Sequence, residues 1–135
     1  MYKHILVPIA ADHPATTDDT LKLAQRLLSE GGRLTLLTVL ETIPGYVAQQ
    51  IPEDHLEKNR QTVLDRLNND IAHLENAEAK LSVGHPAREI QTYSEDHDVD
   101  LIMIASHRPG LQDYFLGSTA ARVVRHAKCA VHVLR

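Results

Sequence analysis

The sequence predicts an α/β protein with three layers, in which a parallel sheet is covered by helices on both faces. Short β-rich runs alternate with segments of helical periodicity along the whole chain, and this alternation requires right-handed parallel crossovers. The run Arg33–Leu40 is almost continuously apolar, as is typical of a strand covered on both faces. The chain has 135 residues, so we expect residues 1–135 to form a single domain.

The first predicted strand is the β-rich segment His4–Ile9, and turn-forming residues separate it from a helix. We expect this helix to run from about Ala15 to Glu30, with apolar residues at helical spacing on one face. Gly31 and Gly32 are expected to end it. The second strand is then Arg33–Leu40.

Residues 41–52 contain two prolines and a glycine, which predicts irregular structure. A long amphipathic helix is expected to follow, from about Glu53 to Glu75. Its apolar stripe consists of Leu56, Val63, Leu67, Ile71 and Leu74.

The rest of the chain continues the alternation of strands and helices. Lys80–Val83 is a short third strand, and Pro86 stands in the first turn of the next helix, where its missing N–H is tolerated. Asp100–Ala105 is the fourth predicted strand. After a loop, a helix from Ser118 to about Ala127 precedes the last strand, Ala130–Leu134.

Composition excludes several classes of protein. The chain carries 14 Lys+Arg against 18 Asp+Glu, a net charge of −4, and its scattered cations do not make the basic patch that nucleic-acid binding needs. Its single cysteine, Cys129, excludes an internal disulfide. No apolar run approaches the ~20 residues that span a bilayer, and the N-terminus lacks the pattern of a signal peptide. We therefore expect a cytoplasmic protein without nucleic-acid or membrane partners.

The start of the helix near Ser118 has the features of an anion site. In open parallel sheets, ligands bind beyond the carboxyl ends of the strands. Gly117, Ser118 and Thr119 bring backbone amides, a hydroxyl that can cap the helix and the positive end of the helix dipole to that edge. The alternative is that Ser118 is an ordinary N-cap and Gly117 an ordinary turn residue.

Common catalytic and metal signatures are missing from the sequence. It contains no GxxxxGK[ST] loop and no GxGxxG after the first strand. The nine histidines show no HxxxH or HExxH spacing, so we expect solvated surface histidines and no metal site. His107 and Ser118 lack a third group to orient them as a hydrolase pair. No dedicated catalyst is expected.

Four segments carry a resemblance to a known family. The opening HILVPIA, the strand LTLLTVL, the run VDLIMIASHRPG and the ending FLGSTAARVVRHAKCAVHVLR resemble the universal stress protein family across essentially the whole chain. The spacing in SHRPGLQDYFLGS is similar to the short F/G-type branch of the bacterial proteins. The resemblance implies a five-stranded parallel sheet in the order 3-2-1-4-5, of the adenine-nucleotide alpha hydrolase-like kind.

The resemblance also implies an ATP site, although this chain departs from the family's binding motif. That motif has Gly, two residues, Gly, nine residues, and Gly followed by Ser or Thr. Here Ala105 and Arg108 stand at the two glycine positions, and eight residues separate Arg108 from Gly117. Gly117 and Ser118 match. Ala10 stands where family members usually have an Asp.

The resemblance implies ATP, or the related ADP or AMP, as the ligand, with Mg²⁺ held largely by the phosphates and water. Six residues would line the adenosine pocket, with the Val39 backbone facing the adenine, and the other seven would surround the ribose and phosphates. Carried over by position, these nucleotide-binding residues are Pro8, Ile9, Ala10, Val39, Ile104 and Ala105, then Ser106, His107, Arg108, Gly110, Gly117, Ser118 and Thr119.

Three hypotheses of function remain open. The first is a stress-response sensor or regulator that binds ATP and associates with an unknown regulatory protein. The second is an interaction module of the same family that binds no nucleotide, and the third is a slow ATPase or autophosphorylating protein. In each case the apolar terminal strand Ala130–Leu134 predicts a homodimer, because an uncovered edge strand can pair with a copy of itself.

Overall fold

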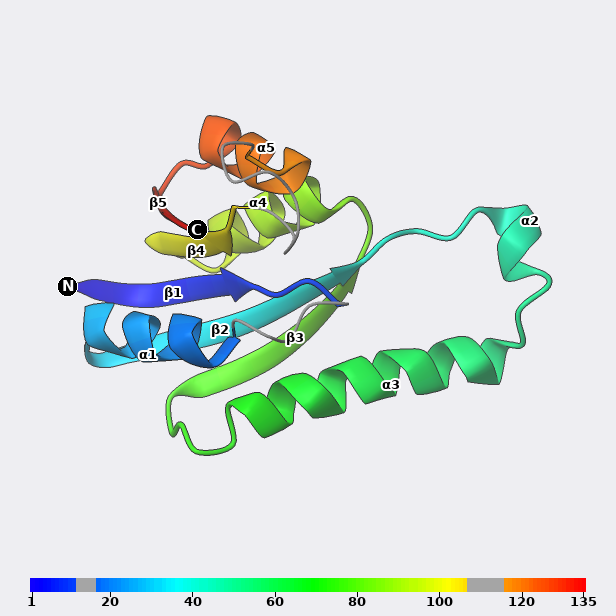
Figure 1. Ribbon diagram of the computed structural model, residues 1–135, viewed down its shortest axis with the longest axis horizontal. Helices are drawn as coiled ribbons and strands as arrows, with labels where there is room; N and C mark the ends of the chain where they lie inside the picture. Colours follow the sequence, from blue (N-terminus) through cyan, green and yellow to red (C-terminus); the bar gives the residue numbers. More distant parts are fainter. Residues whose placement is uncertain (12–16, 107–115) are drawn as a thin grey trace.

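The sheet has five strands in the order β3-β2-β1-β4-β5 (Figure 1), and the four neighbouring pairs are parallel. The computed structural model describes residues 1–11, 17–106 and 116–135. Both the α/β fold class and the predicted strand order are confirmed. The strands are β1 (Tyr2–Pro8), β2 (Leu28–Leu40), β3 (Ala77–Val83), β4 (Leu101–Ala105) and β5 (Ala130–Leu134).

Helices cover both faces of this sheet. On one face, α1 (Thr17–Leu27) and α3 (Glu53–Asp70) pack over a core cluster that includes Ile5 and Val7 of β1. On the other face, α4 (Pro86–Asp96) and α5 (Ser118–His126) pack over a cluster that includes Leu6. Successive residues of β1 thus point to opposite faces and are buried on each, which explains why its centre, Ile5 to Val7, is continuously apolar.

The predicted end of the first helix is wrong. Helix α1 ends at Leu27, four residues before Gly31, and β2 begins at once. The register between β1 and β2 then shifts, from Tyr2 opposite Leu28 to His4 opposite Arg33. Gly31 has φ +77°, a conformation that glycine adopts readily, so the glycines serve an irregularity in the strand rather than a helix stop.

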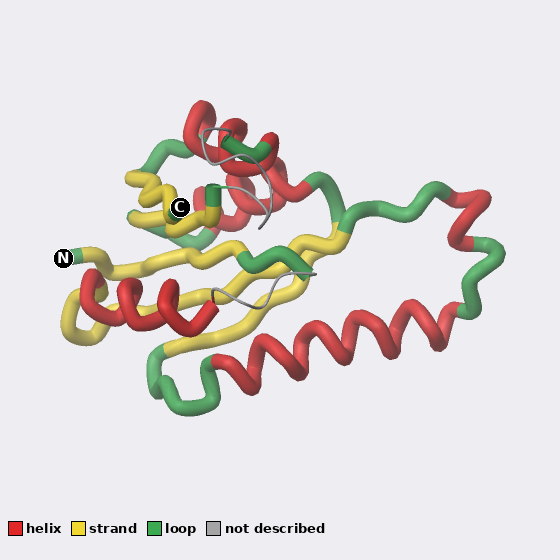
Figure 2. Tube along the Cα trace, in the orientation of Figure 1, coloured by secondary structure: helices red, strands yellow, loops and turns green. Residues whose placement is uncertain are grey.

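Helix α3 is shorter than predicted and only partly packed. It ends at Asp70 instead of Glu75, after an Asn-Asn-Asp sequence whose side chains compete for backbone hydrogen bonds. Its buried residues are Val63 and Leu67. The first half of α3 and the short α2 (Gly45–Ala48) extend beyond the sheet as an arm (Figures 1 and 2). The apolar stripe therefore becomes buried only at Val63, about two helical turns after Leu56.

The expectation of solvated surface histidines is wrong for His4, which is 3% exposed. Its ring lies 2.9 Å from the His97 carbonyl through Nδ1 and 2.8 Å from the Thr35 hydroxyl through Nε2. Asp100 accepts hydrogen bonds from the backbone N–H groups of Lys3 and His4, both at 2.9 Å. These contacts tie the amino ends of β1, β2 and β4 together, and we call His4, Thr35, His97 and Asp100 the amino-end network.

Within the described ranges, no helix has the length and apolar character needed to cross a membrane.

Candidate functional site

The candidate site is the carboxyl edge of the sheet at β1 and β4. β1 pairs with β2 on one side and β4 on the other, so the strand order reverses at the β1–β4 junction. At such a switch point the loops leave in opposite directions and open a crevice for a ligand. The sequence-predicted residues come from the ends of β1, β2 and β4 and from the start of α5.

The end of β1 is held rigidly against β2. Pro8 and Ile9 are half-buried, whereas Ala10 is exposed. The Ile9 N–H donates to the Leu37 carbonyl at 2.8 Å, and the Thr38 hydroxyl donates to the Ile9 carbonyl at 2.8 Å. Both polar backbone groups of Ile9 are therefore used inside the protein, and Ala10 is the first residue of this rim that solvent reaches freely.

Sequence analysis missed Arg66, which lies near this rim. Its Nη2 donates to the Ala11 carbonyl at 2.6 Å, a contact between residues 55 positions apart. In the sequence, Arg66 stands directly before Leu67 of the apolar stripe. The helical periodicity gives no sign that the Arg66 side chain has a partner elsewhere in the fold. No local sequence signal could have shown that the helix brings this guanidinium against the segment after β1.

Val39 lies on β2, on the other side of β1, and is half-buried. Alternate residues of a strand direct their backbone groups to opposite neighbours. The Leu37 carbonyl accepts from the Ile9 N–H, on the side of β1. The Leu40 carbonyl accepts from the Gly84 N–H, on the opposite side, next to β3. By this alternation the N–H and C=O of Val39 face the side of β1, where that strand has just ended.

At the end of β4, burial alternates between neighbouring residues. Ile104 is buried, Ala105 is exposed and Ser106 is 2% exposed. The Ser106 N–H donates to the Leu134 carbonyl of β5 at 2.7 Å, and its carbonyl accepts from the Gly117 N–H at 2.5 Å. Ser106 thus joins β4 to β5 and to the start of α5, and its side chain lies inside the protein.

The start of α5 differs from the predicted capping arrangement. Gly117, not Ser118, is the N-cap residue, and the helix has no side-chain cap hydrogen bond. Ser118 is the first helical residue and is exposed; Thr119 is half-buried. The prediction that Ser118 caps the helix is wrong, because the chain enters the helical conformation at Ser118 itself, one residue earlier than a serine cap at this position requires.

This arrangement changes which amides an anion could meet. The Gly117 N–H is already bonded to Ser106, so it is satisfied within the chain. The amides of Ser118, Thr119 and Ala120 are the first three of α5 and lack a carbonyl one turn earlier in the helix. The first turn of α5 has no acidic residue, and its last turn has Arg125 and His126, so its N-terminal end stays favourable for an anion.

Three predicted binding residues, His107, Arg108 and Gly110, lie outside the described residues. The described ones come together around the β1–β4 junction. Pro8, Ile9 and Ala10 lie at the end of β1, Val39 lies near the end of β2, and Ile104 to Ser106 lie at the end of β4. Gly117 to Thr119 lie at the start of α5, where Gly117 is bonded to Ser106.

In the ranges that the structure describes, no group of three or more His, Cys, Asp or Glu side chains could hold a metal ion.

An open, doubly wound parallel sheet with a helix N-terminus at its switch point defines a class of α/β proteins that bind ligands at the carboxyl edge. The family follows from comparison with known proteins. The model of the universal stress protein family matches residues 1–135. The chain therefore belongs to the universal stress protein family.

Relatives in bacteria and archaea match the whole chain. Universal stress protein G of Salmonella typhimurium is 28% identical over 148 residues, covering 100% of both chains. A universal stress protein of Methanothermobacter thermautotrophicus is 26% identical over 144 residues, covering 100% of this chain and 97% of the other.

Solved structures share the fold. A hypothetical protein solved as a test case of structural genomics superposes with a TM-score of 0.82 at 26% identity, covering 99% of this chain and 96% of that one. UspA from Lactobacillus plantarum gives 0.80 at 24% identity, covering 99% and 98%. Two more distant members were solved with adenine nucleotides: one with cAMP (TM-score 0.70, 18% identity, covering 99% and 97%) and one from Archaeoglobus fulgidus with dAMP (0.62, 16%, covering 99% and 98%).

Proposed function

We propose that this protein is a cytoplasmic stress-response sensor or regulator that binds an adenine nucleotide at the β1–β4 edge. ATP is the proposed ligand, with ADP and AMP as related ones. The observation that carries the proposal is the hydrogen bond between Gly117 and Ser106 at 2.5 Å. It holds the N-terminal end of α5 at the end of β4, so that unpaired helix amides and the sheet's switch point form one edge.

The residues at this edge fit a nucleotide. Ala10 and Ala105 are exposed, and their small side chains would leave room for a ligand beyond the ends of β1 and β4. Adenine has hydrogen-bond donors and acceptors that could pair with the N–H and C=O of Val39, which face the side of β1. The amides of Ser118 and Thr119 suit phosphate oxygens. Mg²⁺ would be held largely by the phosphates and water, and a bound nucleotide would present a changed surface to a regulatory partner.

A homodimer through β5 belongs to the same proposal. β5 is the terminal strand of the sheet, and its residues Val131 to Leu134 are half-buried in the single chain. A second copy could extend the sheet across this edge and complete their burial.

One set of observations favours the alternative, an interaction module that binds no nucleotide. The side chain of Ser106 is buried, the amide of Gly117 is satisfied inside the chain, and Ala10 supplies no carboxylate for a ribose. These three positions would then serve the fold alone, and function would rest on the dimer surface.

Gly117→Asp separates the two candidates. An aspartate is favourable at an N-cap, and Gly117 has φ −60°, so the variant should fold while placing a carboxylate beside the phosphate-binding amides. Gly117→Asn is the matched control, because it offers a cap of the same shape without the charge. The protein is first purified without nucleotide, and any released nucleotide is identified by mass detection.

Calorimetric titration with ATP and Mg²⁺ then gives the affinities. We expect micromolar binding, worth about 8 kcal/mol, in wild type and Gly117→Asn, and none in Gly117→Asp. Equal affinity in all three proteins would disprove the assigned site. Wild-type protein that carries no nucleotide and binds none would support the alternative function.

A further inference from the structure

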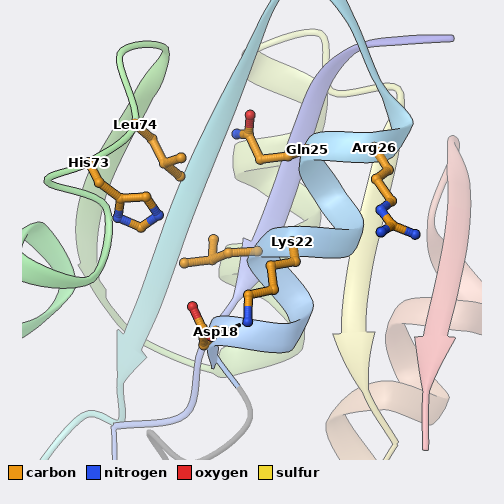
Figure 3. A pocket seen from close by; sticks show the side chains of 7 residues that line it. Asp18, Lys22, Gln25, Arg26, His73 and Leu74 are labelled. Carbon is orange, nitrogen blue, oxygen red and sulfur yellow. Dashed lines mark ion pairs between the residues drawn. The ribbon is translucent and has the colours of Figure 1, made fainter.

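The structure contains a cavity whose lining residues all lie outside the β1–β4 edge. It lies between α1 and the turn that follows α3, and its volume is about 270 Å³. Figure 3 shows side chains from both elements around it. Its lining includes Asp18, Leu21, Lys22 and Gln25 from α1 with His73 and Leu74 from the turn.

Most of the wall is an extension of the apolar core. Leu21 is 3% exposed and belongs to the core cluster of this face, and Leu74 packs against that cluster. Figure 3 shows the Leu74 side chain on the opposite side of this space from the residues of α1. A molecule with an apolar body placed here would continue the core, which is the ordinary driving force for small-ligand binding.

Gln25 introduces an unmet hydrogen-bond requirement into this apolar wall. It lies one turn after Leu21 on the same face of α1, and its amide extends from the helix toward Leu74 (Figure 3). Its Nε2 is buried, and among the described residues no group accepts a hydrogen bond from it. Leaving such a donor unpaired is unfavourable, whereas an acceptor bound in the cavity would satisfy it.

The charges around the cavity indicate that this acceptor is uncharged. Lys22 is paired with Asp18 at 2.7 Å on the exposed side of α1, and the Arg26 side chain extends away from Leu74 (Figure 3). Lys22, Arg26 and His73 all line the cavity but are exposed, so the buried part of the wall offers one neutral amide donor and no cation. A carboxylate would lose more hydration than one amide returns, whereas an uncharged ketone or ester oxygen has far less hydration to lose than a carboxylate.

We propose that this cavity is a second binding site, for a small apolar molecule that carries an uncharged carbonyl group. The carbonyl accepts from Gln25 Nε2, and the hydrocarbon part covers Leu21 and Leu74. None of its lining residues belongs to the β1–β4 edge, so the cavity is distinct from the proposed nucleotide site.

The test uses heptan-2-one as the probe and heptan-2-amine as its matched control. The two have the same carbon skeleton, but the protonated amine has no acceptor. Titration of the ¹⁵N-labelled full chain follows the side-chain N–H resonances of Gln25 directly. We expect heptan-2-one to shift these resonances in a saturable way and the amine to leave them unchanged.

Gln25→Leu removes the donor with little change of volume. We expect it to weaken heptan-2-one binding about fivefold to tenfold and to raise the melting temperature of the free protein, because an unpaired buried donor is lost. Gln61→Leu is the control, since the Gln61 amide is already paired with Asp65 at 2.7 Å on α3; its probe affinity should equal that of wild type.

Three outcomes would overturn the proposal. They are no saturable shift of the Gln25 side chain, equal binding of ketone and amine, and unchanged ketone affinity in Gln25→Leu. A Gln25 amide that shows a contact to long-lived water and no response to the ketone would assign the cavity to solvent.

Discussion

The two ends of the sheet treat polar groups in opposite ways. At the amino end, His4 and Thr35 are 3% and 0% exposed, and their side chains are bonded to each other. At the carboxyl end, the Ser118 side chain is exposed, and the first amides of α5 have no partner within the helix. Paired polar groups stabilise the fold, whereas exposed unpaired ones are available to a ligand, so the same strands combine a structural end with a candidate binding end.

The amino-end network shows how complete this pairing is. Burial acts to raise the pKa of the Asp100 carboxyl, but the hydrogen bonds from the N–H groups of Lys3 and His4 outweigh it and hold the pKa below its usual value. Burial also lowers the pKa of His4, and the hydrogen bond to the His97 carbonyl opposes this only in part. The native contacts therefore favour the charged form of Asp100 and the neutral form of His4.

The largest effect is expected for Asp100→Ala. The substitution leaves the N–H groups of Lys3 and His4 without their carboxylate acceptor. We expect the free energy of unfolding to fall by about 2–3 kcal/mol, measured by urea unfolding at pH 7. Asp96→Ala is the control, because Asp96 is exposed at the end of α4; it should change stability by no more than about 0.5 kcal/mol. Equal losses in the two variants would contradict the assigned structural role.

A more gradual effect is expected from pH. The folded state binds fewer protons than the unfolded chain between the ordinary histidine pKa and the lowered pKa of His4. The free energy of unfolding should therefore be largest above pH 6.5, decrease as the pH falls below it, and stop decreasing for this group below the lowered pKa. Urea unfolding across this range measures the slope. His4→Gln should remove the His4 contribution, and an unchanged slope in that variant would show that other histidines cause it.

The smallest effect on stability is expected for Ser118→Ala. Ser118 is exposed and makes no capping hydrogen bond, so the free energy of unfolding should change by no more than about 0.5 kcal/mol. Under the proposed function the hydroxyl binds phosphate, and its loss should weaken ATP affinity by a factor of about 3 to 10. Unfolding and calorimetry on the same preparation compare the two quantities. A stability loss above 1 kcal/mol would assign Ser118 to the fold instead.

Sequence patterns predicted where β2, β3, β4 and β5 end, but β2 begins five residues and β3 three residues earlier than predicted. β5 begins and ends where the alternation of Ala130–Leu134 placed it, and β4 differs by one residue. Helices α1 and α3 both end earlier than predicted. A buried strand needs apolar residues along its whole length, which makes it visible in sequence. A helix end depends on which residues meet the sheet, and sequence periodicity alone does not record that contact.

The candidate site was only partly predictable for the same reason. The residues at the ends of β1, β2 and β4 follow from the strand assignments and the strand order. The role of Gly117 as N-cap, its hydrogen bond to Ser106 and the contact of Arg66 with Ala11 do not. They join residues that are 11 and 55 positions apart, and no local pattern encodes such pairs.

The sequence by itself determined the α/β class, the parallel sheet and the resemblance to the universal stress proteins, because local hydrophobic patterns and short motifs need no knowledge of distant contacts. Only the tertiary structure decided that His4 is buried in a polar network, that Gly117 is satisfied by Ser106, and that Gln25 faces a cavity without a described partner. Whether a polar group is paired or available depends on which distant residue the fold brings to it.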